Sequence, residues 1–209
     1  MCNILVTGFT PFDGRQNNAS WVAASSLRGS GIRTIEIPVI WGAATEFLDS
    51  ACNDHCPDII ISMGEGREGW FDIETVASNT RKERPDNNDC LPQGVPIAAD
   101  GPAFRKTPIQ MGFLQRILSG HGYPIRLSMD AGQFLCEEAL YSLIRLKESR
   151  HRLKLIIFCH VPPYGTNIHI KGQQTVCDIN TLTAFAKILL GAARDFCTNT
   201  TEGFVYKNG

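Results

Sequence analysis

Cys136 lies at the start of a predicted helix, a position that can activate a thiol. The residues from Ser128 to Gln133 are typical of a strand end followed by a turn, and Phe134-Leu135-Cys136 then opens a predicted helix. A free thiol has a pKa of about 8.5 and is only slightly ionised at neutral pH. Unpaired N–H groups at a helix N-terminus favour the thiolate, so Cys136 is the candidate nucleophile of a hydrolase.

The thiol also needs a cationic partner, because two carboxylates follow it directly. Glu137 and Glu138 are good helix starters, but their charge opposes the thiolate. His160 can be the partner, since it comes directly after the apolar run 155–158. An imidazole is then expected at the carboxyl end of a strand, where parallel sheets build their sites. Cysteine with histidine is an activated-nucleophile arrangement.

Such a pair calls for a third group that orients the imidazole. Glu74 is the best candidate, because it interrupts the mainly uncharged stretch 73–79 and could be held partly buried. Asp72 and Asp130 are rivals. Each assignment competes with a plainer one, since a cysteine on a helix is usually packed and a glutamate in a strand usually faces solvent.

Apolar runs separated by turn residues place these side chains on an α/β framework. Strands are predicted at 4–8, 34–40, 59–64, 70–79, 125–128 and 153–158, and helices from Asn18 or Ser20 to Leu27 and at 43–52, 107–120, 134–148 and 181–196. Alternating strands and helices imply a three-layer αβα sandwich with a largely parallel, twisted central sheet. We expect the strand ends at Gly8, Gly64, Ser128 and His160 to gather at one edge.

The length of the chain and the absence of a polar linker predict one domain over residues 1–209. The connection 80–106 is rich in Pro, Asn, Asp and Gly and is longer than compact domains usually carry, so it is a candidate lid or interface.

Composition argues against several classes of function. Lys plus Arg total 20 against 21 for Asp plus Glu, which gives no overall signal for nucleic acid or an anionic membrane. No apolar run reaches the roughly 18 residues that span a bilayer, and the N-terminus lacks the pattern of a signal peptide, so we expect a cytoplasmic protein.

The cysteines and the glycine-rich segments predict neither a metal nor a cofactor. Eight scattered cysteines favour free thiols, and the pair Cys52 and Cys56 around His55 has no second half at zinc-site spacing. Residues 64–66 do not complete a dinucleotide fingerprint, and there is no Walker-type loop or Gly-x-Ser-x-Gly elbow.

Four segments share order and spacing with one peptidase family. Residues 7–14 (TGFTPFDG) are similar to a Gly-Phe-x-Pro-Phe-x-Gly signature, and residues 73–79 (IETVASN) to a segment with a catalytic Glu. Residues 131–136 (AGQFLC) resemble an Ala-Gly-x-x-x-Cys turn, and residues 158–162 (FCHVP) a His-Val-Pro motif. Together they resemble the pyrrolidone carboxyl peptidase (pyroglutamyl peptidase type I) family of cysteine peptidases over nearly the whole chain.

The resemblance implies a phosphorylase/hydrolase-like fold and a role for each catalytic candidate. Cys136 would be the nucleophile, His160 the base and acid, and Glu74 the residue that orients the imidazole. The implied substrates are peptides with an N-terminal pyroglutamyl residue, and no metal or cofactor is required. Members of the family often form homo-oligomers, so a dimer or tetramer is implied.

The same resemblance implies a substrate pocket. Phe9 and Phe12 would sandwich the flat lactam ring, and backbone groups near Leu135 would bond its polar edge. Recognition by apolar faces and a few hydrogen bonds suits a group that has no charged amine.

Departures from the family pattern leave two other functions open. Glu65 stands where many members carry Gln, and a carboxylate there could select a cationic substrate, as in a related amidase. Arg84 matches the arginine of the family only if one residue is deleted, and otherwise Glu83 stands there. A noncatalytic small-molecule binding protein on the same fold is the other alternative.

Overall fold

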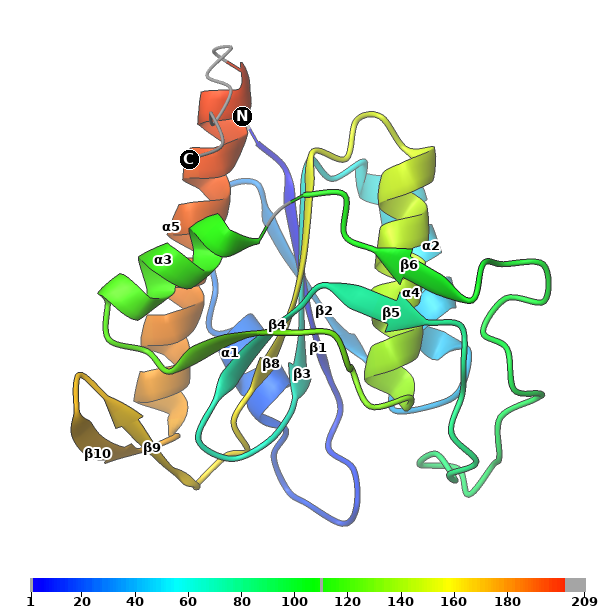
Figure 1. The fold of residues 1–209 in the computed structure, drawn as a ribbon, viewed down its shortest axis with the longest axis horizontal. Helices are drawn as coiled ribbons and strands as arrows, with labels where there is room; N and C mark the ends of the chain where they lie inside the picture. The colour runs from blue at the N-terminus through cyan, green and yellow to red at the C-terminus, as the bar shows by residue number, and fades with distance from the viewer. Residues whose placement is uncertain (1, 110, 202–209) are drawn as a thin grey trace.

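The computed structural model describes residues 2–109 and 111–201 and has a six-stranded sheet between two layers of helices (Figure 1). The sheet has the order β2-β1-β3-β8-β4-β7. Its strands are β1 Ile4–Phe9, β2 Ile32–Ile37, β3 Ile59–Glu65, β4 Phe71–Glu74, β7 Ile125–Ser128 and β8 Leu155–Val161. The helices are α1 Ala19–Ser25, α2 Ala43–His55, α3 Gly112–Gly120, α4 Leu135–Ser149 and α5 Ile179–Thr201. This is the predicted three-layer arrangement.

Each face of the sheet carries its own apolar core. Residues of β1 alternate, so that Ile4 and Val6 pack with helices α1, α3 and α5, whereas Leu5 packs with α2 and α4. Figure 1 shows the same division, with α1, α3 and α5 on one side of the sheet and α2 and α4 on the other. Strands buried on both faces are nearly continuous apolar runs, which is why β1, β3 and β8 are readable in the sequence.

The sheet is parallel over four strands and then reverses. β2, β1, β3 and β8 run in one direction. β4 is antiparallel to β8, with Asp72 opposite His160, and β7 follows the direction of β4. The expected gathering of four strand ends is therefore right for Gly8, Gly64 and His160 but wrong for Ser128, because the carboxyl end of β7 points toward the opposite edge.

Several predicted boundaries move because of tertiary hydrogen bonds. The single strand expected at 70–79 breaks at Thr75, whose N–H and hydroxyl both donate to the Ser128 carbonyl at 2.8 and 2.7 Å. Its second half, β5 Val76–Ser78, leaves the sheet and pairs with β6 Phe104–Lys106, so the connection 80–106 ends in a strand. β8 continues to Val161, so His160 lies within the strand instead of after it.

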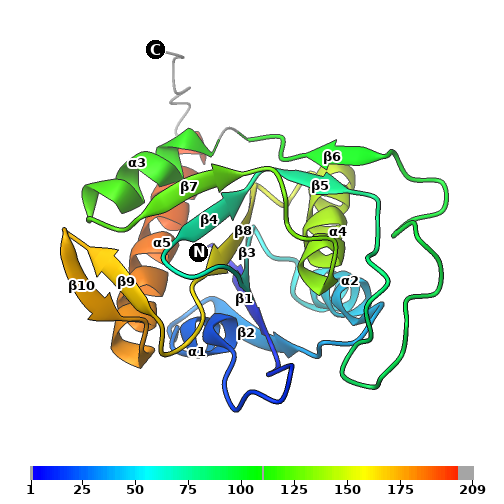
Figure 2. The same cartoon turned by 60° about the horizontal axis from the view of Figure 1, so that its bottom comes forward.

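Two further predictions about elements are corrected. The helix expected from 107 begins at Gly112, because the Thr107 N–H donates to the Thr75 carbonyl at 2.9 Å and extends the β5–β6 pairing; Gln110 lies outside the described residues. The sequence also missed a hairpin, β9 Asn167–Ile170 with β10 Gln173–Val176. Figure 2 shows this hairpin beside α5, whereas the two-stranded sheet of β5 and β6 lies beside α4.

The long connection is ordered by two side chains. The Asn79 amide donates to the carbonyls of Ala98 and Gly101 at 2.8 and 3.1 Å and accepts from the Ala98 N–H at 2.9 Å. Buried Asp86 accepts from the N–H groups of Trp41, Asn88 and Cys90, at 3.0, 2.8 and 3.1 Å. The role of the connection 80–106 as a lid or interface stays a prediction. No helix in the described part of the chain is long and apolar enough to cross a membrane.

Gly8 permits the close approach of β1 and α1, and replacing it tests this packing. A Cβ there would lie 2.6 Å from the Ser20 carbonyl oxygen and 2.7 Å from the Trp21 Cα. Because both are backbone atoms, Gly8→Ala should lower the free energy of unfolding by about 1–3 kcal/mol in urea denaturation. Gly191→Ala is the control, since apart from the neighbouring backbone of α5 no atom of the described residues lies within 4 Å of a Cβ built there. It should be neutral or stabilising by up to about 1 kcal/mol. Equal effects of the two substitutions would contradict the packing argument.

Candidate active site

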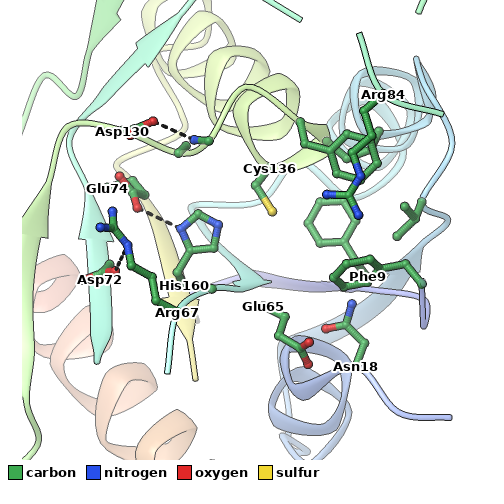
Figure 3. A pocket seen from close by; sticks show the side chains of 17 residues that line it. Phe9, Asn18, Glu65, Arg67, Asp72, Glu74, Arg84, Asp130, Cys136 and His160 are labelled. Atoms are coloured by element: carbon green, nitrogen blue, oxygen red, sulfur yellow. Dashed lines mark hydrogen bonds and ion pairs between the residues drawn. The ribbon is translucent and has the colours of Figure 1, made fainter. Parts of the chain in front are cut away.

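Cys136 and His160 meet above Gly64, at the carboxyl edge of the parallel strands. The thiol is half-buried on the second residue of α4, and His160 is 7% exposed near the end of β8. A Cβ on Gly64 would lie 2.6 Å from Cys136 Sγ and 3.0 Å from His160 Cδ2. Only glycine leaves this space open, and Figure 3 shows the sulfur of Cys136 beside the imidazole of His160.

Glu74 is the carboxylate that reaches the imidazole. The Nδ1–H of His160 donates to Glu74 Oε1 at 2.8 Å, and Glu74 is 1% exposed. The rivals are engaged elsewhere, since Asp72 accepts two hydrogen bonds from Arg126 at 2.8 and 2.9 Å and Asp130 accepts from the Gly132 N–H at 3.0 Å. The geometry therefore selects Glu74 from the three predicted candidates.

The surroundings of His160 favour its protonated form. Burial lowers its pKa, but the charge of Cys136 and hydrogen bonds to Cys136 and Glu74 outweigh that effect and raise the pKa to about 10. An imidazolium at neutral pH stabilises a neighbouring thiolate. The arrangement thus places a cationic imidazole beside the thiol, as an activated nucleophile requires.

The two acidic residues after the nucleophile are built into the fold. Glu137 accepts from the N–H groups of Ser78 and Gln133 at 2.6 and 3.0 Å. Burial raises the pKa of Glu137, and the two hydrogen bonds from backbone N–H groups oppose that shift. Buried Glu138 is paired with Arg81 at 2.9 Å and also accepts from the Gly42 N–H at 2.9 Å. Glu137 therefore holds the nucleophile turn at Gln133, and Glu138 links α4 to the start of α2 with its charge offset by Arg81.

Backbone N–H groups at the start of α4 are available for an anion. The turn before the helix adopts positive φ at Gly132 (89°) and Gln133 (58°), which directs the chain into the helix beside the thiol. Within the described residues, nothing accepts a hydrogen bond from the N–H groups of Leu135 and Cys136. Such donors at a helix N-terminus suit the oxyanion of an acyl-transfer intermediate.

All eight residues predicted for the site line one cavity of about 370 Å³. They are Phe9, Phe12, Glu65, Glu74, Arg84, Leu135, Cys136 and His160. The cavity fits a small substrate group, with apolar rings at one end and the thiol near its middle (Figure 3). The individual binding roles of these residues stay predictions.

Two charged residues of the cavity have partners. Glu65, whose side chain is 2% exposed, forms an ion pair with Arg15 and accepts from the Ala19 N–H at 2.8 Å, at the start of α1. Arg84 lies with its guanidinium 4.3 Å from the centre of the Phe134 ring. Arg84 lines the cavity and Glu83 does not, which favours the alignment with one deletion.

Sequence reasoning missed several residues of the cavity wall, among them Asn18, Phe134 and Arg67. Asn18 was expected only as a helix cap, and it does cap α1 by accepting from the Ser20 N–H at 3.0 Å. Phe134 and Arg67 also line the cavity. Arg67 follows the carboxyl end of β3, which is the one signal that could have found it. Among the described residues there is no cluster of three or more His, Cys, Asp or Glu that could hold a metal ion.

Comparison with known proteins points to one family. The family model described as "Pyroglutamyl peptidase" matches residues 2–192. The pyrrolidone-carboxylate peptidase of Bacillus cytotoxicus is 29% identical over 200 residues, which cover 92% of this chain and 93% of the relative. The pyrrolidone-carboxylate peptidase of Bacillus subtilis is 36% identical over 148 residues, 68% of this chain and 69% of the relative.

The fold leads to the same family. The crystal structure of Bacillus amyloliquefaciens pyroglutamyl peptidase I superposes with a TM-score of 0.79 at 28% identity, over 93% of this chain and 98% of that one. This similarity confirms the predicted α/β class. With the family model matching most of its length, the chain belongs to the pyroglutamyl peptidase family of cysteine peptidases.

Proposed function

We propose that this protein removes the N-terminal pyroglutamyl residue from peptides, with Cys136 as nucleophile, His160 as base and acid, and Glu74 orienting the imidazole. The observation that carries the proposal is the hydrogen bond of 2.8 Å between His160 and Glu74 beside a half-buried thiol, inside one cavity. Membership in the peptidase family supports the same reaction.

Acylation begins with attack of the Cys136 thiolate on the carbonyl carbon of the pyroglutamyl residue. The carbonyl oxygen becomes an oxyanion that accepts hydrogen bonds from the N–H groups of Leu135 and Cys136. The carbon–nitrogen bond then breaks, and the imidazolium of His160 gives its Nε2 proton to the leaving amine. The products are a thioester on Cys136 and a peptide shortened by one residue.

Hydrolysis returns the enzyme to its starting state. His160, now neutral, takes a proton from a water molecule, and the resulting hydroxide attacks the thioester carbon. The carbon–sulfur bond breaks, pyroglutamate leaves, and the thiolate and imidazolium are restored. No electron transfer is needed, and the proton is carried by one residue throughout.

The cavity suits a neutral acyl group. Phe9 and Phe12 supply the apolar faces for a lactam ring, and the charge of Glu65 is offset by Arg15 and by the N-terminus of α1. A carboxylate engaged in this way is a weak trap for a free amine, which disfavours the amidase alternative. The single domain, the homo-oligomer and the cytoplasmic location remain predictions.

Turnover of a chromogenic pyroglutamyl amide tests the reaction. Wild-type protein should release the chromophore, and Cys136→Ala should show no release above background, because the nucleophile is gone. Iodoacetamide should also label Cys136 at pH 6–7 faster than the exposed Cys56, since a stabilised thiolate reacts first. Binding of the amide without turnover, together with slow labelling, would instead support the noncatalytic binding protein.

The pKa of His160 predicts an alkaline limit of activity. A pKa raised from 6.5 to about 10 means that the imidazolium contributes stability in full below about pH 6.5 and loses it as the pH rises through about 10. The value of kcat/KM should fall over the same upper range, because the leaving amine loses its proton donor. Glu74→Gln removes one cause of the raised pKa of His160 and should move this alkaline fall of kcat/KM to lower pH. An alkaline fall that stays in place in the pH profile would refute the role of Glu74.

The Glu65→Gln variant distinguishes a pyroglutamyl peptidase from an amidase that selects a cationic substrate. The amide can still accept from the Ala19 N–H, so turnover of a pyroglutamyl amide should change by less than about 10-fold, the scale of one partly exposed ion pair and one neutral hydrogen bond. The wild type should prefer the pyroglutamyl amide to a glutaminyl amide, which carries a free amine. A wild-type preference for the glutaminyl amide, lost in Glu65→Gln, would establish the amidase.

A further inference from the structure

The catalytic pair divides the cavity into two sides of different chemistry. Figure 3 shows Phe9, Asn18, Glu65 and Arg84 on one side of Cys136 and His160, and Arg67, Asp72, Glu74 and Asp130 on the other. If the lactam ring lies on the side of Phe9, the rest of the peptide leaves toward the second side. This step rests on the proposed function.

Arg67 is the exposed cation of that second side. Its side chain lines the cavity and is 61% exposed, and its one ion pair within residues 2–109 and 111–201 joins Nε to Asp72 Oδ2 at 3.7 Å. The same carboxylate already accepts two shorter hydrogen bonds from Arg126, at 2.8 and 2.9 Å. Two guanidinium charges therefore share one carboxylate, so the group carries one net positive charge.

The other acidic groups nearby do not neutralise the positive charge of Arg67. Glu74 faces the imidazolium of His160 at 2.8 Å. Asp130 accepts from the Gly132 N–H and keeps its charge, but it is exposed, so solvent screens that charge. Glu68 follows Arg67 in the chain and is exposed, so its charge is well screened by solvent. The terminal N–H groups of Arg67 donate to no other described residue, and a guanidinium presented in this way at the side of a cavity matches the geometry of a carboxylate.

We propose that Arg67 is a specificity-determining residue that binds a carboxylate on the amino acid following pyroglutamate. That carboxylate has two possible sources, the C-terminus of a pyroglutamyl dipeptide or an acidic side chain at this position. Both present the same charged oxygens to the guanidinium. Arg67 would therefore favour short or acidic leaving groups over neutral ones.

Three substrates test the proposal. They are pyroglutamyl-alanine with a free carboxylate, pyroglutamyl-alanine amide without one, and pyroglutamyl-glutamate amide with only a side-chain carboxylate. The readout is the ratio of kcat/KM for each acidic substrate to that for the neutral amide, which does not depend on the amount of active enzyme. For the wild type the larger of the two ratios should be about 5 to 10, the scale of one charge-assisted hydrogen bond at a partly exposed site. The carboxylate whose substrate gives the larger ratio, C-terminal or side-chain, is the one that Arg67 binds.

The variants should change this ratio in a definite order. Arg67→Gln should bring it to about 1, and Arg67→Glu should bring it below 1, because a like charge repels the leaving carboxylate. Arg152→Gln is the matched control, since Arg152 is 62% exposed and lies 3.8 Å from Asp58 at the opposite edge of the sheet. It should keep the ratio of the wild type. Raising the salt from about 0.05 to 0.5 M should lower the ratio in the wild type and in Arg152→Gln, which both keep Arg67. It should leave the ratio of Arg67→Gln unchanged.

The outcomes separate this proposal from the proposed function. A ratio that Arg67→Gln leaves unchanged, or a ratio of about 1 for both acidic substrates in the wild type, overturns the role of Arg67. An equal loss on acidic and neutral substrates in Arg67→Gln also overturns it, because Arg67 would then act only through Asp72. Failure of the wild type to cleave the neutral amide at all contradicts the peptidase activity itself.

Discussion

The hydrogen bond between His160 and Glu74 is the interaction on which the site depends. A buried carboxylate is costly unless it is paired, and Glu74 has its described partner in the imidazole, through Oε1. The pair holds the imidazole in one orientation and helps to raise the pKa of His160. The thiolate of Cys136, the oxyanion donors and the order of proton transfers all assume this protonated ring.

The reversal of one strand creates that interaction. Because β4 is antiparallel to β8, Asp72 stands opposite His160, and Glu74 lies two residues along on the same face. A diagonal neighbour on a sheet is within reach of a long side chain, which suits glutamate. Phe71 and Ile73 alternate with these acids and enter the core on the other face. The strand thus joins the core and the site through its period of two.

Arginine partners organise the remaining charges around the thiol. Arg81 pairs with Glu138, Arg15 with Glu65, and Arg126 with Asp72. Each pair keeps a carboxylate in the fold without leaving its charge free in the cavity. In the proposed reaction the acyl side meets a neutral ring, and the leaving side presents the positive charge of Arg67. The proposals thus assign two chemically different halves of a substrate to one cavity.

The sequence alone determined the local features of this protein and the family to which it belongs. Apolar runs of buried strands, the turn before Cys136 and the four motifs are local patterns, so they survive without coordinates. Only the tertiary structure decided the direction of β4, the choice of Glu74 over Asp72, and the partners of Glu65 and Glu138. Each of these depends on residues more than 40 positions apart that meet only when the sheet is assembled. Strand direction and ion-pair partners are long-range properties, and local periodicity does not encode them.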